Sequence, residues 1–167
     1  RVIIHARKAI LKGLSPKDNR SVPPLNYALV LRMKEKFPNL HISINGGVKS
    51  LEEANNFLLM GLDGVMIGRS AYQQPAQILS DVDSVIFERG EINSSLDVAN
   101  KMRFYIKQHC ENGGKPHQVT RHMMGLFHGL PGAKIWKQHL SRSGISNNID
   151  VYDEALVAVS ALLTQTA

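Results

Sequence analysis

The apolar residues in the first half of the chain come in short runs separated by amphipathic segments. The runs are rich in β-branched residues and are little interrupted by polar ones; they lie at residues 2–5, 41–45 and 64–68. Runs of this length and composition predict strands that are buried on both faces. Because such strands belong to parallel sheets, the pattern already favours an α/β fold.

Segments with helical spacing of apolar residues follow these runs. Residues 25–37 stop at Pro38, and residues 50–60 open with Ser-Leu-Glu-Glu, the pattern of a capping box. A third helix is expected over residues 75–79, where the proline occupies a first-turn position that needs no N–H. The alternation of strand and helix predicts three units of a parallel sheet over residues 1–80.

Two architectures contain such units. A closed eight-stranded barrel needs about 250 residues, so residues 1–80 would supply only the C-terminal part of a TIM (β/α)8 barrel. A doubly wound open sheet is the alternative. Because the chain begins at Arg1 and enters a strand-like run at once, we expect it to be the tail of a longer polypeptide.

The strand pattern ends near residue 80. Helical patterns replace it, separated by glycine-rich turns, at residues 96–109, 118–126, 132–140 and 149–164. We therefore expect an all-α helical domain over residues 81–167, with the boundary between residues 80 and 92.

The composition is that of a soluble globular protein, with 43% hydrophobic and 20% charged residues. No stretch approaches the roughly 20 consecutive apolar residues that a membrane-spanning helix requires, so no membrane association is expected. The single cysteine, Cys110, can form no internal disulfide and has no neighbours at zinc-ligand spacing. A cytoplasmic, reducing setting without a metal site is the expectation.

Positive charge is concentrated in one block of the helical part. Residues 101–142 hold eight Lys/Arg and one acidic residue, which gives 8 − 1 = +7, and they contain five of the seven histidines. Such a block favours a polyanionic partner, most simply nucleic acid. A solvated basic face without a partner is the alternative.

Glycines follow two of the predicted strands. Asn45-Gly46-Gly47 ends the second strand, and Gly68-Arg69 ends the third. At such turns the lack of a Cβ permits positive φ and close approach of a ligand, so that backbone N–H groups and the arginine can hold a phosphate. In α/β barrels a phosphate commonly lies between the last two strand ends. His5 ends the first strand, where it would either contact a cofactor or be an ordinary interior histidine.

A long basic loop separates the first strand from the first helix. Residues 8–20 carry Lys8, Lys12, Lys17 and Arg20 and occupy the position of an active-site lid. The alternative is a solvated loop with no task.

The helical part contains a second basic feature. A Gly-Leu-Pro-Gly turn at residues 129–132 starts a helix that presents Lys134 and Lys137 on one face, where both could meet phosphates. Phe127 and Trp136 fall within apolar helical stripes and are interpreted as core residues. Cys110 is interpreted as an incidental rather than a reactive cysteine.

Several of these motifs together resemble one family. They are His5-Ala6-Arg7, residues 11–20 (Leu-Lys-Gly-Leu-Ser-Pro-Lys-Asp-Asn-Arg), Ile44-Asn45-Gly46-Gly47, residues 63–69 (Asp-Gly-Val-Met-Ile-Gly-Arg) and residues 125–134 (Gly-Leu-Phe-His-Gly-Leu-Pro-Gly-Ala-Lys). The set resembles the tRNA-dihydrouridine synthases, and the second and last segments resemble the A-type subfamily in particular. The resemblance extends over almost the whole chain.

The resemblance implies a flavin enzyme on a TIM barrel, with a helical C-terminal domain that grips tRNA at the D-loop and elbow. Such an enzyme reduces the C5=C6 bond of a D-loop uridine around position 20/20a, with hydride passing from NADPH to FMN and then to the base. The complete protein would be a monomer.

The resemblance also implies roles for individual residues. His5 matches a flavin-contacting histidine, Asn45, Gly46 and Gly47 match a first phosphate loop, and Gly68 and Arg69 match a second. The tRNA-binding positions fall on Lys17, Arg20, Lys134 and Lys137. The last two are often arginine in relatives, and lysine lacks the bidentate fork.

The proton-donating cysteine of the family has no counterpart in this sequence, and Cys110 does not match it. The 167-residue chain alone is therefore expected to be inactive. Two alternatives remain open: a non-enzymatic RNA-binding module, and an FMN barrel oxidoreductase that acts on a small molecule.

Overall fold

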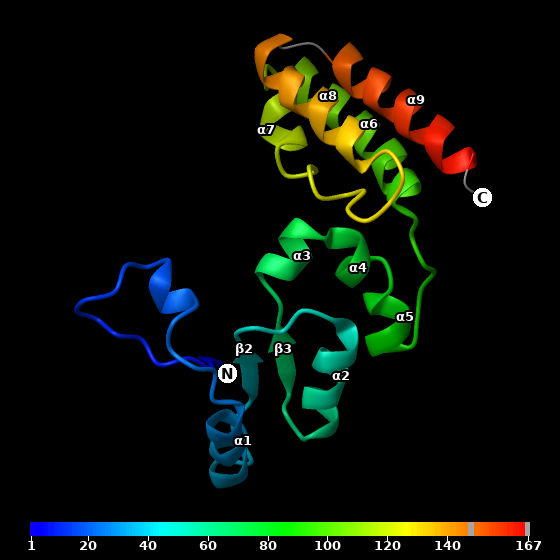
Figure 1. Ribbon diagram of the computed structural model, residues 1–167. Helices are drawn as coiled ribbons and strands as arrows, with labels where there is room; N and C mark the ends of the chain where they lie inside the picture. The colour runs from blue at the N-terminus through cyan, green and yellow to red at the C-terminus, as the bar shows by residue number, and fades with distance from the viewer. Residues whose placement is uncertain (147–148, 166–167) are drawn as a thin grey trace. The chain divides into compact units, whose positions relative to one another are not determined.

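The computed structural model describes residues 1–146 and 149–165 (Figure 1). These residues form two compact units, which divide after Ser70. This division lies before the boundary expected at residues 80–92, because the segment after Ser70 contacts the helical part. The Tyr72 hydroxyl lies 3.0 Å from His122 Nδ1, and Gln74 Nε2 lies 3.0 Å from His128 Nε2.

A parallel three-stranded sheet organises the first unit. Its strands are β1 (Val2–His5), β2 (Ile42–Asn45) and β3 (Gly64–Met66), and β2 lies between the other two. Ile42 and Ile44 of the central strand are fully buried. The α/β prediction is confirmed for these residues, although β3 is shorter than the predicted run. Three parallel strands are compatible with both a barrel and an open sheet.

Two capped helices connect the strands: α1 (Tyr27–Lys36) and α2 (Leu51–Leu59). The Asn26 side chain accepts a hydrogen bond from the Leu29 N–H, and the Ser50 hydroxyl accepts one from the Glu53 N–H. Each cap satisfies a backbone donor that the first helical turn leaves unpaired. The predicted start of α2 is confirmed, although the Glu53 carboxylate accepts from the Lys49 N–H instead of closing the box on Ser50.

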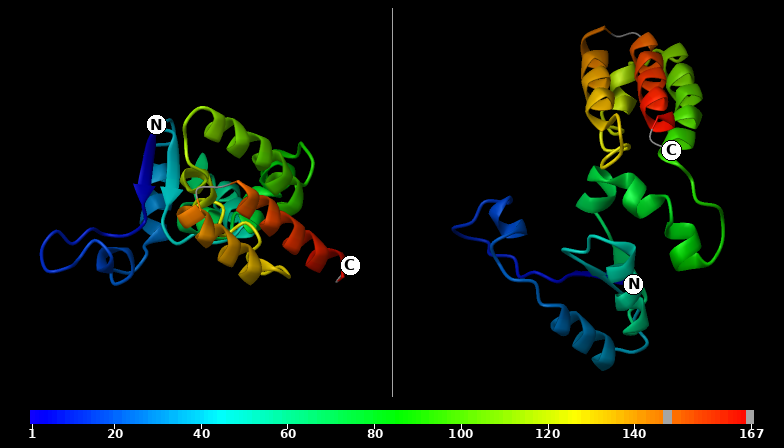
Figure 2. Two further views of the ribbon diagram at one scale, coloured as in Figure 1. Left: turned by 90° about the horizontal axis from the view of Figure 1, so that it is seen from above. Right: turned by 45° about the vertical axis from the view of Figure 1, so that its right-hand side comes forward.

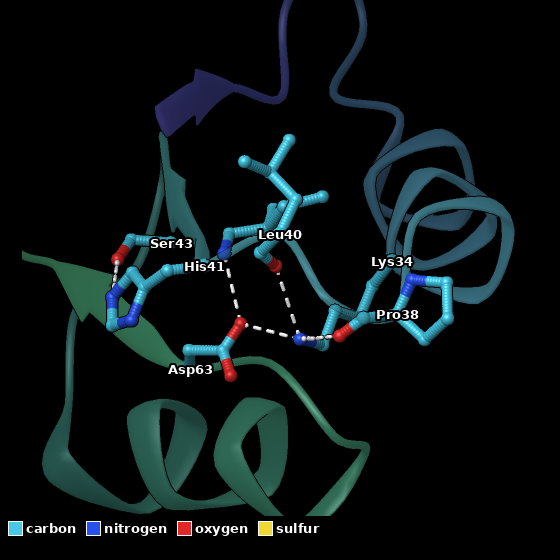
Figure 3. Close-up of polar contacts among 7 residues, drawn as sticks. Lys34, Pro38, Leu40, His41, Ser43 and Asp63 are labelled. Atoms are coloured by element: carbon cyan, nitrogen blue, oxygen red, sulfur yellow. Dashed lines mark hydrogen bonds and ion pairs between the residues drawn. The ribbon is translucent and has the colours of Figure 1, made fainter. Parts of the chain in front are cut away.

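An ion pair fixes the end of α1 to the beginning of the sheet (Figure 3). Lys34 Nζ lies 2.7 Å from Asp63 Oδ2 and also donates to the carbonyls of Pro38 and Leu40. The same Asp63 oxygen accepts from the Ile42 N–H at 2.8 Å. This network lies at the amino end of β2, opposite the end where the glycine turns follow.

Helices make up the second unit. α3 (Arg69–Gln73) leads into it, and the others are α4 (Pro75–Leu79), α5 (Val82–Phe87), α6 (Ser95–Glu111), α7 (Pro116–Thr120), α8 (Ala133–Ser146) and α9 (Asp150–Thr164). Figure 2 shows α6, α8 and α9 packed side by side. Neither α3 nor α5 was predicted from the sequence.

The helix predicted over residues 118–126 is wrong in its second part. Helix α7 ends at Thr120, and turns follow it. Side chains satisfy carbonyls of this segment: Trp136 Nε1 donates to the Met123 oxygen at 2.8 Å, and the Ser95 hydroxyl donates to the Leu126 oxygen at 2.8 Å. Because side chains outside the segment donate to these two carbonyls, the carbonyls remain paired without the hydrogen bonds of a continued helix.

An aromatic cluster forms the core of the second unit. Trp136 contacts Phe127 and Tyr152 edge to face, with ring centroids 4.8 and 5.5 Å apart. All three are fully buried, and the Tyr152 hydroxyl donates to the Ala99 carbonyl at 2.7 Å. The interpretation of Phe127 and Trp136 as core residues is confirmed. Among the residues described, no helix is long and apolar enough to cross a bilayer.

Candidate functional site

The three strands end at one edge of the sheet, and most of the predicted cofactor-binding residues follow there. His5, Asn45 and Met66 are aligned in neighbouring strands. The Ala6 N–H donates to the Asn45 carbonyl at 2.7 Å, which extends the pairing just past the strand ends. Because the strands are parallel, the carboxyl end of β1 brings His5 beside the turn that follows β2, and the turn that follows β3 lies on the other side of β2.

The first turn, Gly46-Gly47, requires glycine at both positions. Their φ angles are +116° and +78°, in the left-handed region that other residues avoid. A Cβ on Gly46 would lie 3.0 Å from His5 Cε1, and one on Gly47 would lie 2.5 Å from Leu25 Cδ1 and 2.7 Å from the Tyr27 hydroxyl. The turn is therefore enclosed on one side by protein atoms.

Tyr27 holds this turn by a hydrogen bond. Its hydroxyl donates to the Gly46 carbonyl at 2.9 Å, and its ring contacts Phe57 edge to face at 4.8 Å. Burial, followed by the nearby Glu53 carboxylate, raises the pKa of Tyr27, so its hydroxyl remains a donor at neutral pH. Sequence reasoning missed Tyr27; its only local signal is its place directly after the cap residue Asn26.

The second turn lies beside the first. The Ser70 hydroxyl donates to the carbonyl of Val48 at 3.4 Å, joining the residue after Arg69 to the residue after Gly47. Arg69 is exposed as the first residue of α3, and a Cβ on Gly68 would meet nothing within 4 Å. The two turns thus flank open space at the edge of the sheet, with an arginine at its margin.

These features fit the phosphate of a nucleotide cofactor. The Gly46-Gly47 turn, which only glycine can adopt, lies near an exposed guanidinium at the same sheet edge, and backbone N–H groups together with an arginine are the donors that bind phosphates.

The basic loop forms a compact turn of its own. The Asn19 side chain pairs with both the N–H and the carbonyl of Ile10 at 2.8 Å, and Arg7 Nη1 donates to the carbonyls of Ser21 and Pro23. Lys17 is the N-cap residue of the short helix η1 (Asp18–Arg20), Arg20 is its last residue, and both are exposed. The loop that carries these two residues projects away from the sheet (Figure 1).

The second basic feature is an open groove along α8. Lys134 and Lys137 line it together with Arg142 and polar side chains, as their spacing predicted. Cys110, at the end of α6, is half-buried, and burial raises the pKa of its thiol. A thiol in that environment is not activated. In the parts of the chain described, no three potential ligands gather in a metal-binding group.

The sequence matches a protein-family model along almost its full length. The model, described as "Dihydrouridine synthase (Dus)", covers residues 1–160. The chain belongs to the dihydrouridine synthase family.

Three curated relatives of this chain each carry the name "tRNA-dihydrouridine(20/20a) synthase". The protein from Shewanella oneidensis is 49% identical over 150 residues, which are 89% of this chain and 44% of the relative. That from Vibrio vulnificus is 46% identical over 159 residues, 93% of this chain and 48% of the relative. That from Escherichia coli K12 is 47% identical over 161 residues, 95% of this chain and 46% of the relative. The chain thus spans a little less than half the length of these relatives.

Proposed function

We propose that the complete protein is an A-type tRNA-dihydrouridine synthase that reduces the D-loop uridines 20 and 20a. The observation that carries the proposal is the pairing of two glycine turns at one sheet edge, joined by the Ser70–Val48 hydrogen bond. The name of the relatives supports the substrate. The parallel sheet would then be part of a TIM barrel, whose active sites lie at the carboxyl ends of the strands.

Residues of this chain would hold the phosphate end of FMN. The backbone of Asn45-Gly46-Gly47 and of Gly68-Arg69 would surround the phosphate, and the Arg69 guanidinium would neutralise its charge. His5, 3.0 Å from the position of a Gly46 Cβ, would contact the cofactor beside this turn. When bound, FMN would transfer hydride from NADPH to C6 of the uracil, which is the electrophilic carbon of the C5=C6 bond.

Two basic regions would hold the tRNA. Lys17 and Arg20 lie on the projecting loop, and Lys134 and Lys137 line the α8 groove. Phosphate contacts from such residues fix the register of the RNA, while the target uridine leaves the base stack to reach the flavin. The ammonium groups of Lys134 and Lys137 act as point charges rather than bidentate forks.

The chain would not carry the whole reaction. Reduction of the C5=C6 bond requires a proton in addition to the hydride. The thiol of Cys110 lies in the helical unit, and burial raises its pKa, so it is not suited to supply this proton. We therefore expect the acid to lie outside these 167 residues. The isolated chain would then bind RNA without reducing it.

The decisive experiment measures dihydrouridine in an unmodified tRNA transcript by mass spectrometry, with NADPH and the complete protein. The expected result is one or two dihydrouridines at positions 20 and 20a, a bound flavin spectrum, and no product with the 167-residue chain alone. Product from the isolated chain would contradict the assignment of the acid.

The same preparation separates the two alternatives. Absence of flavin absorbance from the complete protein would favour a non-enzymatic RNA-binding module. Bound flavin without salt-sensitive tRNA binding would favour an oxidoreductase that acts on a small molecule, because contacts to RNA phosphates weaken steeply with salt.

A further inference from the structure

The helical unit contains a polar pocket that none of the assignments above uses. Its volume is about 350 Å³, and it lies where residues 72–74 meet residues 121–128 and Lys137 of α8. Gly125 makes the close approach of these segments possible, because a Cβ there would overlap the Gln73 carbonyl. The walls of the pocket are therefore set by backbone packing.

A chain of hydrogen bonds orients an arginine at this pocket. Arg121 Nε lies 3.0 Å from His122 Nε2, and His122 Nδ1 lies 3.0 Å from the Tyr72 hydroxyl. An arginine nitrogen can only donate, so His122 Nε2 must accept, and Nδ1 of the neutral ring then carries the hydrogen. Arg121 commits only its Nε–H to this contact, which leaves its two terminal nitrogens for a ligand.

The charge of the pocket is positive. Arg121 and Lys137 both line it, and no Asp or Glu is among its lining residues. In the described parts of the chain, neither cation takes part in an ion pair. A guanidinium with two free terminal nitrogens suits the two oxygens of a phosphate. Lys137 also lines the α8 groove, so the pocket and the groove share a side chain.

We propose that this pocket receives a phosphodiester group of the bound RNA, held by Arg121 and Lys137, and that His122 positions Arg121. The proposal rests on the proposed function, since it takes tRNA as the partner. An RNA strand that follows the groove past Lys134 would present its next phosphates to the pocket through Lys137.

The test uses the complete protein and an unmodified tRNA transcript, with affinity measured by fluorescence anisotropy at several salt concentrations. Arg121→Gln removes the fork and should weaken binding roughly tenfold, and it should reduce the slope of log affinity against log salt by about one. Arg89→Gln is the matched control, because it removes one positive charge from an exposed arginine that lies outside both the pocket and the basic block of residues 101–142. It should change the affinity less than twofold.

Two variants of His122 distinguish a role in positioning Arg121 from a role in the stability of the fold. In His122→Gln the side-chain oxygen can still accept from Arg121, and tRNA affinity should stay close to that of the unaltered protein. In His122→Phe the ring remains but cannot accept, and affinity should fall several-fold with an unchanged melting temperature. A structural role for His122 would instead lower the melting temperature in both variants.

The outcomes distinguish this proposal from the function it rests on. If the unaltered protein forms dihydrouridine but Arg121→Gln binds tRNA as tightly as Arg89→Gln, the pocket assignment is wrong and the enzyme assignment stands. Equal tRNA affinities of His122→Phe and His122→Gln would overturn the positioning role. If the unaltered protein does not bind tRNA, both proposals fail.

Discussion

The hydroxyl of Tyr27 donates a hydrogen bond of 2.9 Å to the carbonyl oxygen of Gly46. This contact fixes the first glycine turn from the first residue of α1. Tyr27→Phe keeps the ring against Phe57 but removes the donor. We expect the complete protein to bind FMN several-fold more weakly and to lose about 1 kcal/mol of stability. Flavin titration and thermal unfolding would measure the two effects.

Tyr105→Phe is the control for that variant, since it removes the same hydroxyl from an exposed tyrosine of α6. It should alter neither FMN affinity nor stability. Equal FMN affinity in the Tyr27 and Tyr105 variants would show that the hydrogen bond does not shape the cofactor site.

Arg69 supplies the side-chain charge of the proposed phosphate site. Arg69→Ala should weaken FMN binding roughly tenfold, because it removes charge-assisted hydrogen bonds to the phosphate. Arg32→Ala, at an exposed position on α1, is the control for loss of an arginine. Flavin content of the purified proteins and equilibrium dialysis provide the measurement. Undiminished flavin occupancy in Arg69→Ala would remove the phosphate assignment.

The groove along α8 should affect RNA but not the flavin. Replacing both Lys134 and Lys137 by Glu should raise the KM for tRNA at least tenfold, because two phosphate contacts become repulsive. The rate of flavin reduction by NADPH without RNA should stay the same. Stopped-flow absorbance and tRNA titration measure the two quantities. Equal damage to both would indicate misfolding rather than a lost contact.

The Lys34–Asp63 pair should make the first unit sensitive to acid. The hydrogen bond from Lys34, followed by that from the Ile42 N–H, lowers the pKa of Asp63. A carboxyl whose pKa is lower in the folded state contributes stability above its unfolded pKa of about 3.9, and this contribution is lost as pH falls through the folded value. Asp63→Asn should therefore lower the melting temperature at neutral pH by a few degrees and weaken its fall below about pH 4.

Glu52→Gln is the comparison for the acid series, because Glu52 is an exposed carboxylate on α2. Its melting profile should follow that of the unaltered protein. If Asp63→Asn and Glu52→Gln gave the same profile, the ion pair would have no part in acid stability.

Local patterns predicted much of the fold. The β-branched runs at residues 2–5 and 41–45 became β1 and β2 because burial on both faces of a parallel sheet selects such residues. The order of strands and helices also placed His5 and the two glycine turns at one edge, since parallel strands share a carboxyl end. The Ser50 cap was visible because its partner lies three residues away.

The remaining features depend on partners distant in the sequence. Residues 121–126 leave the helix because Trp136 and Ser95 pair with their carbonyls. Tyr27 acts on Gly46 from 19 positions away, and Tyr72 reaches His122 from 50 positions away. Single-sequence periodicity holds no information about such pairs. The positioning residues of both proposed sites were therefore found only in three dimensions.

The order β1-β2-β3 leaves the outer sides of β1 and β3 without a neighbouring strand among the described residues. Ile3 and Met66 on these strands are 54% and 46% exposed. Unpaired strand edges with apolar side chains serve as templates for intermolecular pairing. Produced by itself, the chain would be inclined to self-associate, so concentration-dependent light scattering is the first measurement to make on any preparation. Binding assays are best made on samples in which the outer edges of β1 and β3 are not free to pair with another molecule.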